Sequence, residues 1–209
     1  MTKPKKADFF QLTGGIKCYV RDPDRTIPGP LVALQVIPTV SSKICRFGGQ
    51  LGTYYSLAQH VMGVSRRIKV LGGTVAQQLQ GLLHDAGEAF LGGDIPTPVR
   101  LCITGYDELE ETFLNRVMDV FLLPRKIDKL VWQADDEMKV IEAETFLDGG
   151  PLDNWTHLYL NPKVDRKKII KSTFPTGGFP IPWDMGTAEG KLRARLLYLS
   201  AAHFIQIEK

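Results

Sequence analysis

Apolar residues recur every three or four positions in five long stretches of the chain, as they do on the buried face of an amphipathic helix. One stretch shows the pattern well, with Leu57, Val61, Val64 and Ile68 in the apolar stripe and Arg66 outside it. We therefore expect an all-α fold. The pattern predicts helices over residues 54–71, 74–89, 106–121, 127–147 and 187–205.

The remaining segments are less regular. Residues 1–30 are rich in turn residues and predict a small hairpin or an irregular lead-in. Residues 31–37 are apolar, Pro38 breaks or starts an element, and Thr39 is a candidate N-cap for a short helix over 39–47. We expect one domain over 1–209, with a lead-in over 1–37, a helical core over about 38–147 and a loop-rich extension over 148–209 that includes the final helix.

Composition narrows the class of protein. The 209 residues are 44% hydrophobic and 23% charged, which suits a globular domain with a sizeable core. The net charge of +3 is compatible with an anionic substrate but too small to favour nucleic-acid binding. Three widely spaced cysteines, no signal peptide and no apolar run of the ~18–20 residues that a membrane span needs lead us to expect a cytoplasmic protein without membrane contact.

Ionisable residues follow an apolar run in the segment 81–100, where His84 and Asp85 are adjacent and Glu88 and Asp94 come after them. Charged side chains are rarely buried without a partner. A neighbouring histidine and aspartate can bind one metal ion through a nitrogen and an oxygen. The dipeptide alone is more often a surface pair than a ligand pair, so further ligands are needed to support a metal site.

Two other segments supply such ligands. His60 lies among the apolar positions of its helix, and Asp135 adjoins the apolar stripe of a later one. Asp136 points about 100° further round. Taken alone, the histidine suits a core position and the acidic pair a solvated face. Together with His84 and Asp85, they could hold a divalent transition metal inside a helical bundle and leave positions open for water and substrate.

Arg46 and Phe47 precede a glycine pair, and this combination suits a phosphate contact beside an aromatic ring that packs on a sugar or base. The alternative is a surface arginine beside a core phenylalanine. His157 and His203 have no acidic or histidine neighbour at ligand spacing, so we interpret them as structural.

Five short segments, in this order, resemble the HD-domain phosphohydrolase superfamily over about residues 38–146. They are 44–49 (ICRFGG), 55–60 (YSLAQH), 83–90 (LHDAGEAF), 93–98 (GDIPTP) and 133–135 (QAD). The run is similar to the 5'-deoxynucleotidase branch, which has bacterial and prophage members, and to the neighbouring phage dATP triphosphohydrolases. The resemblance implies an HD-domain helical bundle and a divalent ion such as Co, Mn or Zn.

The resemblance also implies roles for single residues. The metal ligands would be His60, His84, Asp85 and Asp135, with Asp135 preferred over Asp136 because it matches the aspartate of the family's Ala-Asp step. Glu88 would orient or deprotonate the attacking water, or protonate the leaving group, and Asp94 would be a second carboxylate near the leaving oxygen. Substrate contacts would come from Arg46, Phe47 and Arg100.

The sequence departs from the family pattern at three points. Gln50 stands where phage-type relatives usually have histidine, and the loop between Glu88 and Asp94 is one residue longer than in the bacterial nucleotidases. Phe47 replaces a tryptophan, which could loosen selection for the deoxy sugar.

The resemblance favours a 5'-deoxynucleotidase that releases phosphate from deoxynucleoside monophosphates (dNMPs). The alternatives are a deoxynucleoside triphosphate (dNTP) triphosphohydrolase that releases triphosphate, and a nucleotide-binding regulator with a vestigial site. By analogy, we also expect a homo-oligomer.

Overall fold

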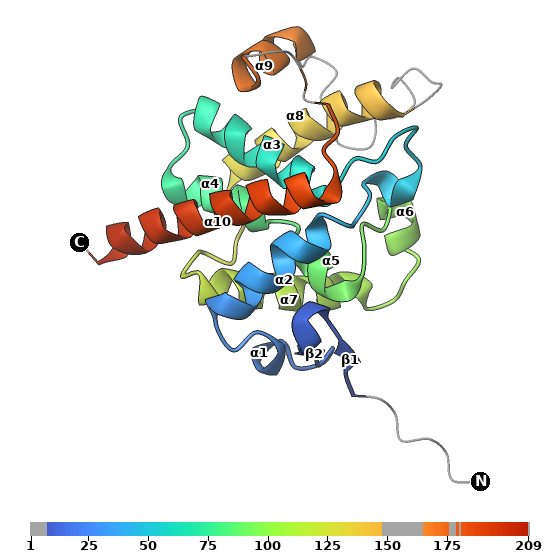
Figure 1. Ribbon diagram of the computed structural model, residues 1–209, viewed down its shortest axis with the longest axis vertical. Coiled ribbons are helices and arrows are strands. Elements are labelled where there is room, and N and C mark those ends of the chain that lie inside the picture. The colour runs from blue at the N-terminus through green and yellow to red at the C-terminus, as the bar shows by residue number, and fades with distance from the viewer. Residues whose placement is uncertain (1–7, 148–164, 176–178, 180, 209) are drawn as a thin grey trace.

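The computed structural model describes residues 8–147, 165–175, 179 and 181–208. Its regular structure is almost entirely helical, which confirms the predicted fold class (Figure 1). The elements are β1 (Phe10–Gln11), η1 (Thr13–Gly15), β2 (Lys17–Cys18), α1 (Pro23–Thr26), α2 (Pro30–Ser41), η2 (Phe47–Gly49), α3 (Leu57–Val70), α4 (Val75–Leu83), α5 (Ala86–Leu91), α6 (Thr97–Arg100), α7 (Tyr106–Val120), α8 (Lys129–Phe146), α9 (Arg166–Thr173) and α10 (Met185–Ile207).

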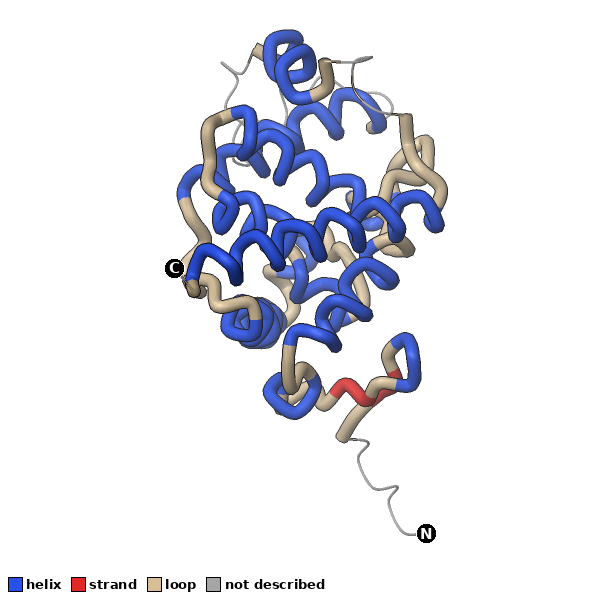
Figure 2. The backbone as a smooth tube through the Cα atoms, turned by 60° about the vertical axis from the view of Figure 1, so that its left-hand side comes forward, coloured by secondary structure: helices blue, strands red, loops and turns tan. Residues whose placement is uncertain are grey.

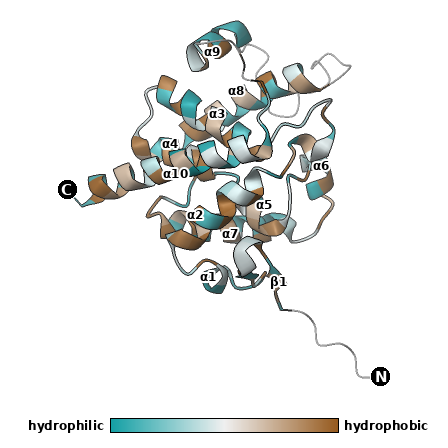
Figure 3. Ribbon diagram, in the orientation of Figure 1, coloured by the Kyte–Doolittle hydropathy of each residue, from teal (hydrophilic) through white to brown (hydrophobic). Residues whose placement is uncertain are grey.

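The helices pack around one continuous core. Helix α3 lies between α4 and α8, α10 crosses α2, α3 and α4, and α5 packs against α2 and α7 (Figure 1). Hydrophilic and hydrophobic residues both occur along these helices, as expected for helices that bury one side and expose the other (Figure 3). The predicted hairpin is present as the two-residue strands β1 and β2, which are antiparallel (Figure 2). No described helix has the length and apolar character of a membrane span.

Helix α2 corrects the prediction of an irregular lead-in followed by a helix over 39–47. The helix begins at Pro30 and continues through Pro38 to Ser41, so Thr39 is an interior residue and not an N-cap. A proline inside a helix removes one N–H and leaves the carbonyl four residues earlier without its helical donor. Here that carbonyl belongs to Leu34, and Nη1 of Arg193 in α10 donates to it over 2.8 Å. A tertiary contact therefore compensates for the missing hydrogen bond.

The helix predicted over 74–89 is divided in two. It starts as expected, because Thr74 and Gln77 form a reciprocal capping box. It then ends at Leu83, and α5 begins at Ala86. Asp85 leaves helical geometry, with φ of −104° and ψ of 19°. The His84-Asp85 step is consequently a turn between two helices.

The extension after α8 contains more helix than predicted. Asp165 caps α9, and Ile169 of this helix is buried. Arg67 of α3 donates from Nη1 to Oγ of Ser172 over 3.1 Å, which ties α9 to the bundle. The last helix, α10, is also longer than predicted at both ends, with Asp184 as its N-cap. The division of the chain into domains stays a prediction.

Candidate metal centre

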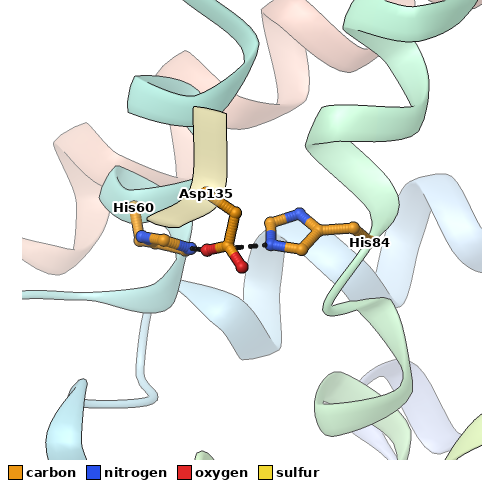
Figure 4. A group of neighbouring side chains, drawn as sticks. All are labelled: His60, His84 and Asp135. Carbon is orange, nitrogen blue, oxygen red and sulfur yellow. Dashed lines mark ion pairs between the residues drawn. The ribbon is translucent and has the colours of Figure 1, made fainter. Parts of the chain in front are cut away.

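Three helical elements bring His60, His84 and Asp135 together inside the bundle, and their side chains point toward one another (Figure 4). His60 lies in the first turn of α3, His84 directly follows α4, and Asp135 lies in α8. Oδ1 of Asp135 is 3.1 Å from Nε2 of His60 and 3.5 Å from Nε2 of His84. All three residues are buried.

Gly81 allows the close approach of helices that places His84. A Cβ atom at this position would lie 2.3 Å from Cδ1 of Ile68 in α3, far closer than two carbon atoms can approach. The absence of a side chain lets α4 pack tightly on α3, three residues before His84. The carbonyl of Gly81 also lies 3.0 Å from Nδ1 of His84.

Asp85 lies beside the same pair of histidines. Its Oδ2 is 3.6 Å from Nε2 of His60 and 3.3 Å from Nε2 of His84. Two ligands about 2.1 Å from one ion are about 3.0 Å apart in octahedral geometry and about 3.4 Å apart in tetrahedral geometry. The observed separations of 3.1 to 3.6 Å match these values. The Asp85 side chain is 18% exposed and lies on the solvent side of the group.

The three most buried ligand atoms lack hydrogen bonds. Nε2 of His60, Nε2 of His84 and Oδ1 of Asp135 have no hydrogen-bond partner among the described residues. A buried polar atom without a partner costs about 1–3 kcal/mol, so such atoms need a reason. A divalent cation would satisfy all three at once. The compact group of two imidazoles and one carboxylate, with the Asp85 carboxylate beside both histidines, therefore fits a transition metal.

The other ring nitrogens have partners. Nδ1 of His60 lies 2.8 Å from Oε1 of Glu142, and Nδ1 of His84 faces the Gly81 carbonyl. A proton on each Nδ1 leaves the lone pair on Nε2, where a metal would bind. Lys139 holds the second oxygen of Asp135, with 2.5 Å between Nζ and Oδ2. These contacts fix the orientation of three of the four candidate ligands.

Two pKa shifts describe the charge balance. Burial and Arg46 lower the pKa of His60, but the carboxylates of Glu142 and Asp135 outweigh them and raise it to about 9. Burial raises the pKa of Asp135, whereas Lys139 and His84 hold it well below its usual range. In the metal-free protein the Asp135 carboxylate is thus ionised at neutral pH. A metal bound at His60 would have to displace its proton.

Arg46 is buried among acidic side chains. Its Nη1 lies 3.2 Å from Oδ2 of Asp94 and 3.8 Å from Oδ2 of Asp85, and its Nε lies 3.7 Å from Oε2 of Glu142. The carboxylates raise its pKa against the opposing effect of burial. The observed partners of Arg46 are therefore carboxylates, and its predicted phosphate contact stays a prediction.

Asp94 joins the loop after α5 to the turn at Arg46 and Phe47. Besides Arg46, its Oδ2 accepts the backbone N–H of Phe47 over 2.9 Å. Phe47 has φ of 56°, a left-handed conformation that is uncommon for a residue with a side chain. The Asp94 carboxylate holds this conformation in place. The roles predicted for Phe47 with the sugar and for Asp94 with the leaving oxygen stay predictions.

Glu88 lies in α5, one turn beyond Asp85, and is buried. Burial and the negative charges of Asp85 and Asp94 raise its pKa well above the usual range. Its Oε2 has no hydrogen-bond partner in the described part of the chain. A carboxyl group with a raised pKa and an oxygen that has no hydrogen-bond partner there suits a group that exchanges a proton with a ligand.

Arg100 is in α6, and its observed ion pairs lie with α7. Nε is 2.9 Å from Oδ1 of Asp107, and Nη1 is 3.0 Å from Oε2 of Glu110. Asp136 is outside the compact His60, His84 and Asp135 group. His203 contacts the carbonyl of Leu122 over 3.3 Å, while His157 lies outside the described residues.

Glu142 and Lys139 were missed in the sequence. A weak signal existed, because they lie seven and four residues after Asp135 in the predicted helix. These spacings place Glu142 two turns and Lys139 one turn further on, near the same face as Asp135. Acidic and basic residues are so common on helix surfaces that this spacing alone could not distinguish them from solvated charges.

No family model matches the sequence. The chain is 32% identical over 142 residues to the Escherichia coli (strain K12) protein YfdR, and the match covers 66% of this chain and 74% of the relative. YfdR is described as uncharacterized. The similarity therefore shows that the two proteins are related but transfers no activity to this chain.

Proposed function

The chain belongs to the same family as E. coli YfdR, and we propose that it is a metal-dependent phosphohydrolase acting on deoxynucleoside 5'-phosphates. The observation that carries the proposal is the convergence of Nε2 of His60, Nε2 of His84 and Oδ1 of Asp135, which are buried and lack hydrogen bonds among the described residues. Asp85 adds a fourth donor on the solvent side.

The substrate class comes from the order and context of these ligands. A histidine on one helix, a His-Asp step at a helix end and an aspartate on a later helix follow the pattern of HD-domain phosphohydrolases. Glu88 and Asp94 are retained between them. The motif at Arg46 and Phe47 resembles that of the 5'-deoxynucleotidases, which supports deoxynucleoside monophosphates as substrates.

The proposed reaction adds water to the phosphorus atom and breaks the bond from phosphorus to the 5'-oxygen. A bound metal would lower the pKa of a water molecule and offset negative charge on the phosphoryl group. Burial raises the pKa of Glu88 well above its usual range, which favours the protonated form, and Glu88 could transfer a proton to the departing 5'-oxygen. Arg46 balances the carboxylates around the centre and so permits an anionic substrate to approach.

A product assay tests the proposal. The protein is loaded in turn with Mn²⁺, Co²⁺ or Zn²⁺ and incubated with each dNMP and each dNTP, and the phosphorus product is identified. Inorganic phosphate from dNMPs, absent in Asp135→Asn, is the expected result. Triphosphate from a dNTP would replace the nucleotidase assignment by a triphosphohydrolase. No turnover with any metal would favour a nucleotide-binding regulator.

A further inference from the structure

Trp132 is an exposed tryptophan next to the candidate metal centre. It lies in α8, three residues before Asp135, and 48% of its surface is exposed. Its ring meets the ring of His84 edge-on, with the centroids 6.5 Å apart and the planes at 87°. The Trp132 indole contacts a candidate metal ligand with one part of its ring and exposes much of the rest to solvent. A planar ligand can stack on this exposed part.

Lys139 lies on the same line of the helix. Seven residues separate it from Trp132, which is about 20° short of two full turns, and Asp135 lies between them about 40–60° to one side. The Lys139 side chain is 38% exposed, although its ammonium group holds Oδ2 of Asp135. One edge of α8 thus carries an exposed aromatic ring, a buried candidate ligand and a partly exposed cation in succession.

We propose that this edge of α8 is the nucleotide subsite, where Trp132 stacks on the base and Lys139 faces the phosphate. The inference rests on the proposed function and adds to it the group that recognises the base. A nucleotide has a flat aromatic base at one end and an anionic phosphate at the other, which matches the order along α8. A phosphate ester without a base would leave Trp132 without a role.

Stacking on an indole has a consequence for specificity. Every base presents an aromatic face, so stacking discriminates weakly between bases. Strong selection would need hydrogen bonds to the base edges. We therefore expect Trp132 to raise activity on all four dNMPs by similar factors.

The test compares two substrates that share the same sugar phosphate, one with a base and one without: dAMP and deoxyribose 5-phosphate. Trp132→Ala should lower kcat/KM for dAMP roughly five- to hundredfold, mainly through KM, because base stacking on an aromatic residue has about this effect. The same substitution should lower kcat/KM for deoxyribose 5-phosphate by a much smaller factor, because that substrate has no base to stack on the ring. Trp132→Phe, which keeps an aromatic face, should retain most of the dAMP activity.

The control is Tyr198→Ala, which removes an exposed ring from α10. It should affect neither substrate. An equal loss on both substrates in Trp132→Ala would show a general disturbance of the centre and overturn the proposal. A changed oligomeric state with an unchanged ratio of the two kcat/KM values would assign Trp132 to a subunit contact and overturn it as well.

The subsite can be tested even if the wild-type protein hydrolyses neither substrate, which would refute the proposed function. Tryptophan fluorescence is then measured during titration with dAMP and, separately, with inorganic phosphate. Quenching by dAMP that disappears in Trp132→Phe, with no quenching by phosphate, would support a base-binding subsite. Identical curves for the wild type and Trp132→Phe would overturn it.

Discussion

Nδ1 of His60 lies 2.8 Å from Oε1 and 3.0 Å from Oε2 of Glu142, and both side chains are fully buried. Glu142 follows Asp135 by two turns of α8. One helix therefore supplies a candidate ligand and also the carboxylate that orients a ligand on α3. The hydroxyl of Tyr55 donates to the same Oε1 over 3.1 Å, which fixes Glu142 in turn.

Replacing Glu142 by Gln should weaken metal binding by about 10- to 100-fold, the usual effect of losing a partner of a ligating histidine. The substitution keeps the shape of the side chain but removes the charge that stabilises the Nδ1–H form of His60. Competition against a chromogenic chelator measures the affinity. Glu144→Gln, on the same helix but partly exposed, is the control. Equal affinities in the wild type and Glu142→Gln would show that the contact does not support the metal site.

Replacing Arg46 by Met should destabilise the metal-free protein by about 3–5 kcal/mol at neutral pH, because it leaves buried carboxylates without their cation. Arg46 lowers the pKa values of Asp85 and Glu88 in the folded state, so these pKa values would rise in the variant. Stability that depends on a raised pKa is present at low pH and lost as pH increases. The deficit should therefore shrink between pH 8 and pH 5 in urea unfolding.

Arg125→Met is the control for the Arg46 variant, because Arg125 forms a comparable ion pair with Asp119 on the surface. Exposed pairs contribute little, so this variant should unfold close to the wild type. If Arg46→Met were as stable as Arg125→Met at pH 8, Arg46 would not be balancing buried charge.

Glu88→Gln should abolish hydrolysis and yet stabilise the metal-free protein. The pKa of Glu88 is raised in the folded state, chiefly by burial, so the folded protein binds a proton that the unfolded chain releases. Its contribution is complete below the unfolded pKa, near 4.5, and falls as pH rises. Unfolding in urea should show a gain for Glu88→Gln that is larger at pH 8 than at pH 5. A gain that does not vary with pH, or one shared by the exposed control Glu208→Gln, would contradict the raised pKa.

Much of the fold follows from local sequence pattern. The predicted stretches 54–71, 106–121 and 127–147 correspond to α3, α7 and α8, and Thr74 begins α4 as expected. Apolar spacing and caps are local, so sequence reveals them. The continuation of α2 through Pro38 is not local, because it depends on Arg193, 155 residues later in the chain.

The candidate site also has features that local sequence reveals and features that depend on distant contacts. The sequence pattern indicates His60 and Asp135 as candidate ligands, because polar residues at or beside an apolar stripe need a partner. Their convergence on one point depends on how α3, α4 and α8 pack, which the pattern of each helix does not contain. The break at His84-Asp85 was missed because the apolar period continues across it to Ala86 and Ala89.

A comparison of metal binding by Asp135→Asn and Asp136→Asn tests whether the buried group of His60, His84 and Asp135 is a metal site. These substitutions are chemically identical and adjacent in α8, but only Asp135 belongs to the buried group with His60 and His84. Elemental analysis and isothermal titration with Mn²⁺, Co²⁺ and Zn²⁺ should show one ion per chain in the wild type and in Asp136→Asn. Asp135→Asn should not bind that ion. It should therefore also fail to release phosphate from dNMPs. If the wild type binds none of these ions, or if Asp135→Asn binds them as tightly as the wild type, the buried group is not a metal site.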